Sequence, residues 1–188
     1  MNLEICILAG GLSTRLGQDK ARLRFGRRTM FSIIRDEAAK VGYPVRVIRR
    51  DLVPRCGPLG GIFTALKTTR ADAVLFLACD MPLVTAKLLR RLVSASGAKM
   101  RPVIVAQDNR VGFPFLLPRT AMAEVEAQIG EKQFSMHALA AKTKARTLRV
   151  PMRSNELFNI NTVSDAEKGA DLLADRYRIL RFARKLSW

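Results

Sequence analysis

The sequence predicts an α/β protein of one domain, in which a mostly parallel sheet is flanked by helices. Short apolar runs alternate with helical segments along the chain, which is the pattern of βα units. The 188 residues are enough for one domain with a substantial core, and no Ser/Pro/Gly-rich tract divides them. A glycine-rich turn directly follows the first apolar run, at the position where open α/β sheets bind ligands.

Six segments are predicted as strands because they are short and apolar. They cover residues 3–8, 45–48, 73–78, 103–106, 113–117 and 147–150. Pro82 ends the third of these segments. Pro114 and Pro118 bracket the fifth segment, which predicts an edge position because proline lacks the N–H group that a central strand donates.

Six segments are predicted as helices, at residues 30–41, 60–68, 85–95, 120–129, 134–141 and 171–186. Thr29 is expected to cap the first helix, and Thr120 the fourth, where Glu124 lies in the next turn. The last helix is amphipathic, and its apolar face is expected to pack on the domain. We therefore divide the chain into a main domain, residues 1–170, and an appended basic helix, residues 171–188. The basic face of this helix is expected to be solvated, with an acidic partner or a membrane surface as the alternative.

The chain is strongly basic, with 33 Lys and Arg against 16 Asp and Glu and a net charge of +17. No aromatic-basic stacking motif or known nucleic-acid module accompanies this charge, so we expect small polyanions as ligands and no nucleic acid. Cys6, Cys56 and Cys79 lack metal-binding spacing and are an odd number, which favours reduced thiols. No signal-like segment or membrane span is evident, and we expect a cytoplasmic protein.

Residues 8–20 are expected to form a loop that holds phosphates. Gly10, Gly11 and Gly17 let backbone N–H groups approach an anion, and Arg15 and Lys20 add positive charge. The spacing fits neither the Walker A loop nor the dinucleotide-binding fingerprint.

Asp80 follows the third predicted strand, at the edge of the sheet where phosphates would arrive. A buried strand fixes the carboxylate in place, which is typical of a ligand for a divalent metal ion. The alternative is that Asp80 caps the turn before Pro82. Because the glycine-rich loop lies at the same edge of the sheet, we favour a metal site.

Three segments resemble those of the molybdenum cofactor guanylyltransferases. Residues 8–20 resemble the family's opening signature, with Leu16 where Met is usual. Residues 56–62 resemble its Gly-Pro-Leu-x-Gly element, with Asp51 shortly before. Residues 158–165 resemble its Phe-x-Asn-Ile-Asn-Thr-Pro-Glu-Asp segment, although Phe158 directly precedes Asn159. The chain is shorter than expected between its first helix and the Gly-Pro-Leu element, and the family's asparagine-bearing loop has no clear counterpart there.

The resemblance implies the Rossmann-like fold of the nucleotide-diphospho-sugar transferases, with residues 1–170 as the nucleotidyltransferase domain. It implies transfer of GMP from GTP to the phosphate of molybdopterin, or of the molybdenum cofactor, with release of pyrophosphate. Magnesium is the implied cofactor. Acceptor molybdoenzymes or cofactor-handling proteins are possible partners. The alternatives are a cytidylyltransferase for the same pterin, a sugar-phosphate nucleotidyltransferase, or a non-catalytic nucleotide- or RNA-binding protein.

The resemblance also implies roles for individual residues. Asp80 would bind magnesium, and Lys20 and Arg15 would act on the triphosphate and the departing pyrophosphate. Asn159 and Asn161 are candidates for the pterin side or for the outer shell of the metal. The residues implied to bind GTP are Leu8, Ala9, Gly10, Gly11, Ser13, Lys20, Asp51, Gly57, Pro58, Leu59, Gly60 and Asp80.

Overall fold

The computed structural model describes residues 2–10, 23–53 and 55–185. Of the predicted site residues, four lie outside the described residues: Gly11, Ser13, Arg15 and Lys20. Most of the predicted phosphate loop lies outside them as well. Within the described residues no helix is long and apolar enough to span a membrane.

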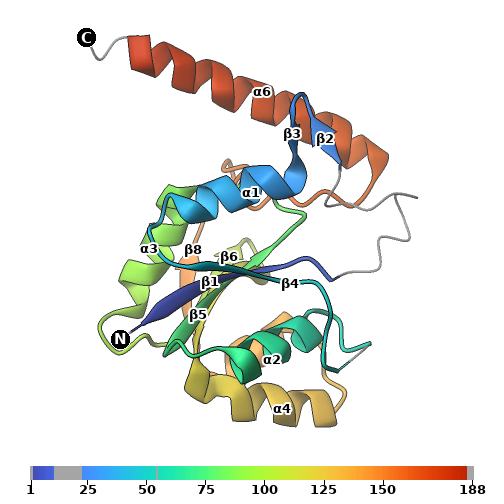
Figure 1. Cartoon of the computed structure of the whole chain (residues 1–188), viewed down its shortest axis with the longest axis vertical. Helices are drawn as coiled ribbons and strands as arrows, with labels where there is room; N and C mark the ends of the chain where they lie inside the picture. Colours follow the sequence, from blue (N-terminus) through green and yellow to red (C-terminus); the bar gives the residue numbers. More distant parts are fainter. Residues whose placement is uncertain (1, 11–22, 54, 186–188) are drawn as a thin grey trace.

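Six strands form one sheet in the order β4-β1-β5-β7-β6-β8 (Figure 1). Strand β1 pairs in parallel with both of its neighbours, and β6 pairs in parallel with β8. Strand β7 runs antiparallel between β5 and β6. The sheet is therefore mixed but mostly parallel, which confirms the predicted fold class. The strands are β1 (Leu3–Leu8), β4 (Val45–Ile48), β5 (Ala73–Ala78), β6 (Val103–Gln107), β7 (Arg110–Pro118) and β8 (Arg146–Arg149).

The prediction of an edge strand at residues 113–117 was wrong, because β7 lies inside the sheet. Opposite β6, the register shifts so that Ile104 faces Phe115 while Val105 faces Gly112. Phe113 and Pro114 therefore fall in a bulge, where a missing N–H group interrupts no ladder hydrogen bond.

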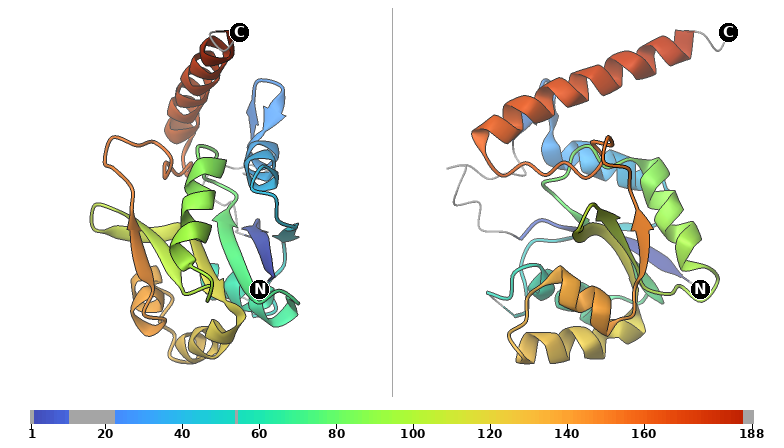
Figure 2. Two further views of the ribbon diagram at one scale, coloured as in Figure 1. Left: turned by 90° about the vertical axis from the view of Figure 1, so that its left-hand side faces the viewer. Right: turned by 180° about the vertical axis from the view of Figure 1, so that it is seen from behind.

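Helices cover both faces of the sheet (Figures 1 and 2). Ile5 and Ile7 of β1 pack into the core beneath α1 and α3, while Cys6 packs into the core beneath α2, α4 and α5. This division follows from the alternation of side chains along a strand. The helices are α1 (Met30–Ala39), α2 (Pro58–Thr68), α3 (Ala86–Ser96), α4 (Met122–Gly130) and α5 (Met136–Lys142).

The starts of the helices agree only in part with those predicted from the sequence. The Thr29 side chain accepts a hydrogen bond from the backbone N–H of Ser32 at 3.1 Å, so the predicted cap of α1 is confirmed. The predicted cap at Thr120 was wrong. Thr120 lies within a 3₁₀ turn, Arg119–Ala121, and α4 begins after it without a side-chain cap.

The last helix, α6 (Val163–Lys185), begins earlier than the predicted residue 171. The Thr162 hydroxyl accepts a hydrogen bond from the N–H of Asp165 at 3.1 Å, and the Asp165 carboxylate accepts one from the N–H of Thr162 at 2.9 Å. This reciprocal cap fixes the start of the helix. Farther along α6, Leu173 packs against Ile33 and Leu83, as its apolar spacing predicted.

Glu37 joins three helices. Its carboxylate, on α1, accepts hydrogen bonds from the Lys40 ammonium at 2.6 Å and from the N–H of Ala86 at the start of α3 at 2.8 Å, and it pairs with Arg176 of α6 at 3.1 Å. Burial acts to raise the pKa of the Glu37 carboxyl, but these hydrogen bonds and charges outweigh it. The pKa therefore lies below its ordinary value of 4.5.

Candidate functional site

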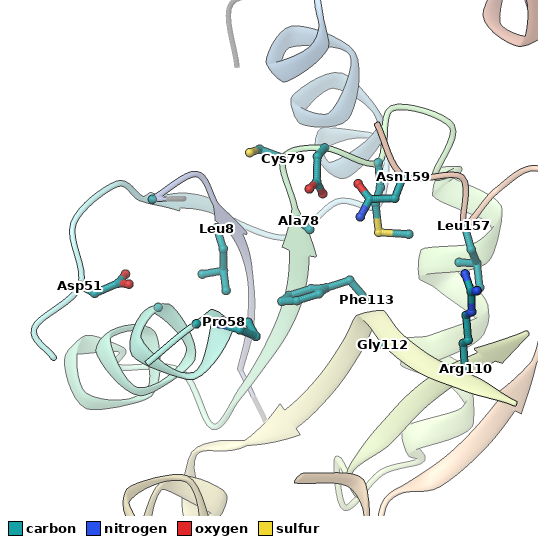
Figure 3. A pocket seen from close by; sticks show the side chains of 15 residues that line it. Leu8, Asp51, Pro58, Ala78, Cys79, Arg110, Gly112, Phe113, Leu157 and Asn159 are labelled. Carbon is teal, nitrogen blue, oxygen red and sulfur yellow. The ribbon is translucent and has the colours of Figure 1, made fainter. Parts of the chain in front are cut away.

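A pocket of about 630 Å³ opens at the carboxyl ends of β1 and β5. This volume lies within the range of small-molecule and cofactor sites. Figure 3 shows Asp51 on one side of the pocket, Asn159, Leu157 and Arg110 on the other, and the ring of Phe113 between them. The residues that line it are Leu8, Gly10, Asp51, Gly57, Pro58, Gly61, Ala78, Cys79, Asp80, Met81, Arg110, Gly112, Phe113, Leu157 and Asn159.

Backbone hydrogen bonds hold the ends of three parallel strands level. The N–H of Ala9 donates to the carbonyl of Ile48 at 2.8 Å, and the N–H of Cys79 donates to the carbonyl of Leu8 at 3.1 Å. The residues that follow β1, β4 and β5 therefore leave the sheet at the same edge. This brings Gly10, Asp51 and Asp80 to one pocket although they are far apart in the sequence.

The Asp51 carboxylate is packed among glycines. A Cβ atom on Gly60 would lie 2.8 Å from Asp51 Oδ2, and one on Gly61 would lie 3.3 Å from Asp51 Oδ1. On the other side, a Cβ atom on Gly10 would lie 3.4 Å from Asp51 Oδ1. The absence of side chains at these three positions makes room for the carboxylate, and burial raises the pKa of Asp51 above its ordinary value of 3.8.

The Gly-Pro-Leu-Gly element has two kinds of residue. Gly57, with φ of 54°, and Pro58 line the pocket at the start of α2. Leu59 is fully buried in the core beneath α2, and Gly60 packs against the loop that follows β4. Leu59 and Gly60 are thus absent from the lining and support the wall from behind.

The end of β5 is tied to the segment before α6. The N–H of Ile160 donates to the carbonyl of Asp80 at 2.9 Å, and the Ile160 side chain is fully buried. This hydrogen bond places Asn159 in the lining beside Asp80. Asn161 is not among the lining residues, and its N–H donates to Asp165 at 3.0 Å. The structure therefore separates the two asparagines that the sequence grouped.

Sequence reasoning did not identify the wall formed by β7. Arg110, Gly112 and Phe113 line the pocket because the β6–β7 hairpin folds back toward the carboxyl ends of β1 and β5. The Phe113 ring packs against Phe115 with centroids 4.9 Å apart, which holds it at the pocket. The Gly-Phe-Pro sequence was the available signal, whereas Arg110 looked like one of many surface cations.

The donor set at Asp80 suits a metal ion that arrives with a polyphosphate. Among the described residues no group of three or more His, Cys, Asp or Glu side chains could form a complete metal site. Mg²⁺ is commonly held by one or two carboxylates together with substrate phosphates and waters. Asp80 supplies one such carboxylate at the pocket.

Comparisons with known proteins agree with this geometry. Residues 5–147 match the model of a family described as MobA-like NTP transferase domain. The molybdenum cofactor guanylyltransferase of Haemophilus influenzae is 33% identical over 89% of this chain and 97% of its own length.

Two solved structures share the fold. Molybdopterin-guanine dinucleotide biosynthesis protein A from Archaeoglobus fulgidus superposes with a TM-score of 0.68 at 17% identity, covering 92% of this chain and 99% of that protein. Rv0371c from Mycobacterium tuberculosis, in a complex with manganese, superposes with a TM-score of 0.62 at 19% identity, covering 89% and 97%.

Proposed function

Because this chain belongs to the MobA-like NTP transferase family, we propose that it is a molybdenum cofactor guanylyltransferase. A phosphate oxygen of molybdopterin, or of the molybdenum cofactor, attacks the α-phosphorus of GTP. The new O–P bond forms as the bond to the β-phosphate oxygen breaks, and pyrophosphate leaves. The observation that carries the proposal is the single pocket in which Gly10, Asp51 and Asp80 meet at the carboxyl ends of three strands.

This reaction needs charge neutralisation and positioning more than a protein nucleophile. A phosphate monoester is already largely ionised at neutral pH because its second pKa is near 6, so no general base is required. Asp80 would hold Mg²⁺, which neutralises charge on the triphosphate when bound. Arg15 and Lys20 are proposed to bind the departing pyrophosphate, with the backbone of residues 10–13 around the phosphates.

Asp51 is proposed to recognise the guanine base of GTP through hydrogen bonds. An ionised carboxylate only accepts hydrogen bonds, and guanine presents two neighbouring donors, N1–H and the exocyclic amino group. Adenine has an unprotonated N1 that would face the carboxylate. Partial burial of Asp51 strengthens this discrimination, because an unmatched polar group is costly where water is excluded.

The opposite wall is proposed to bind the pterin substrate. Phe113 and Leu157 offer an apolar surface for a flat ring, and the exposed Arg110 offers a cation for its phosphate. Asn159 adds an amide at the same wall. Asn161, two residues farther along and outside the lining, stays a candidate for the pterin side or for the outer shell of the metal.

The test is a reaction of the purified protein with molybdopterin, Mg²⁺ and each of GTP, CTP and ATP. Pyrophosphate release gives the rate, and mass spectrometry identifies the dinucleotide product. We expect kcat/KM for GTP to exceed those for CTP and ATP by at least about tenfold, because either competitor leaves a polar group of the site unpaired. Faster turnover of CTP would replace the proposal with a cytidylyltransferase, and no turnover with any of the three would refute nucleotidyl transfer to this acceptor.

A further inference from the structure

Ten of the 33 Lys and Arg residues lie in two segments that α3 and β8 bring together on one surface. Residues 86–101 contain five Lys or Arg residues and no Asp or Glu, and residues 142–155 likewise contain five and none. The fold lays these two segments side by side (Figure 2). Arg146 of β8 donates to the carbonyl of Ala95 in α3 at 3.4 Å. We call this surface, made of residues 86–101 and 142–155, the α3/β8 face.

Two hollows lie on the α3/β8 face, one near each end of α3. The hollow at the end of α3 has a volume of about 560 Å³, and that at its start has about 420 Å³. Glu156 is the one acidic residue in either lining, and it is engaged by the hydroxyls of Thr85 and Ser154. The cations in the two linings are Lys87, Arg91, Lys99, Arg101, Lys144, Arg146 and Arg153.

None of these seven cations forms an ion pair with another described residue. The first half of α6 differs, because residues 163–175 carry four acidic residues, and Asp175 pairs with Arg178 at 2.8 Å. Cations that share a face without counter-charges produce a field that attracts anions over roughly a Debye length, about 10 Å at 0.1 M salt. The α3/β8 face is therefore suited to attract a polyanionic partner.

Strand β8 also offers a free backbone edge on this face. It is the last strand of the sheet, and no described strand pairs with its outer side. The N–H groups of Arg146 and Val150 donate to Pro102 and Ala106, at 2.9 and 2.8 Å on the β6 side. Because backbone groups alternate along a strand, those of Thr147 and Arg149 point to the open edge.

We propose that the α3/β8 face binds an acidic, extended segment of a partner protein, which pairs with the open edge of β8. The partner's backbone would bond to Thr147 and Arg149, and its Asp and Glu side chains would lie against the cations of the two hollows. A peptide suits this surface better than single-stranded nucleic acid does. Neither hollow has an aromatic residue in its lining on which a base would stack.

The test uses the full chain and a fluorescein-labelled peptide of about 12 residues in which Glu and Val alternate, a pattern suited to a strand. Fluorescence anisotropy gives its affinity at low salt. The charge-reversed variant is Lys99→Glu/Lys144→Glu/Arg153→Glu. Its matched control is Arg35→Glu/Arg70→Glu/Lys132→Glu, which reverses three exposed cations elsewhere that have no ion pair with a described residue. Thermal unfolding verifies that both variants fold.

We expect the charge-reversed variant to bind the peptide at least about tenfold more weakly, and the matched control to lose less than about threefold. Thr147→Pro removes one outward donor and should also weaken binding by about tenfold. A peptide that is N-methylated at alternate residues tests the same backbone pairing without changing the protein, so the question is answered even where Thr147→Pro impairs folding.

Three results would overturn the proposal. Equal losses in the charge-reversed variant and the matched control would mean that only net charge matters. Unchanged affinity for the N-methylated peptide would exclude pairing with β8. Tighter binding of a single-stranded RNA oligonucleotide than of the peptide, lost in the charge-reversed variant, would assign the face to nucleic acid.

Discussion

Replacing Gly60 with alanine should damage the proposed nucleoside wall more than it damages the fold. The new Cβ atom would lie 2.6 Å from the carbonyl oxygen of Val53 and 2.8 Å from Asp51 Oδ2. The first neighbour is backbone and the second belongs to a short, packed side chain, so the loop that carries Asp51 must move by several tenths of an ångström.

The cost can be worked from these contacts. Overpacking in a well-packed region costs about 1–3 kcal/mol, and the higher helix propensity of alanine returns about 0.5–1 kcal/mol within α2. The net loss is therefore up to about 2.5 kcal/mol, which corresponds to a fall in Tm of up to about 10 °C for a chain of this size. Because the movement displaces Asp51, kcat/KM for GTP should fall by about 10- to 100-fold.

Two other glycines provide controls for Gly60→Ala. A Cβ atom on Gly130, the last residue of α4, or on Gly112, in the pocket lining, would have no atom within 4 Å. Gly130→Ala should leave both Tm and GTP affinity unchanged or raise Tm slightly, and Gly112→Ala should leave Tm unchanged. Thermal unfolding measures Tm, calorimetric titration measures GTP affinity, and pyrophosphate release gives kcat/KM for GTP. If Gly60→Ala behaves like Gly130→Ala in both assays, the argument from close packing around Asp51 is refuted.

The remaining predictions concern the metal, the helix junction and the last helix. Asp80→Asn keeps the side-chain shape but removes its charge, and turnover should fall by about a hundredfold or more. Equal rates for the two proteins at saturating Mg²⁺ would contradict the metal role. Glu37→Gln should destabilise the protein by about 1–3 kcal/mol at pH 7 in denaturant unfolding. The folded-state pKa of Glu37 is lowered, so this stabilisation is present above pH 4.5 and disappears as the pH falls through the folded-state pKa. A difference between the two proteins that persists unchanged at low pH would show that the charge of Glu37 is not its source. Truncation after Asp175 removes the Arg176 contacts with Glu37 and Leu83, so it should lower Tm. It should leave the GTP dissociation constant and its salt dependence almost unchanged, and a salt-sensitive loss of GTP association rate would contradict this.

Local sequence patterns were sufficient for the parallel half of the sheet. The strands β1, β4 and β5 have the bounds that their short apolar runs predicted. The position of β7 depends instead on a bulge that accommodates Pro114, and the register shift behind that bulge is a property of two strands together. The start of α6 was misjudged because residues 163–170 are mostly exposed and carry little apolar periodicity.

The candidate site was predictable where its residues belong to glycine-rich or strand-end motifs. Asp51, Gly57 and Asp80 were singled out from the sequence, and the structure brings them to one pocket. Arg110 and Phe113 were missed because their place in the lining depends on the β6–β7 hairpin folding back toward the carboxyl ends of β1 and β5. The spacing of residues within a short stretch of sequence does not predict this position of the hairpin.

The connection between β4 and α2 is short, and this limits which residues can select the base of the nucleotide. Only residues 49–57 link Ile48 to the first turn of α2, and the carbonyl of Ile48 is already bonded to Ala9. Asp51 therefore lies only three residues after the end of β4, with Gly10 and Gly61 packed against it. Among the described residues, the proposed choice of base therefore depends on the Asp51 carboxylate and on the glycines packed around it. Base selectivity should then be more sensitive to the packing around Asp51 than to the loss of any single contact on the opposite wall.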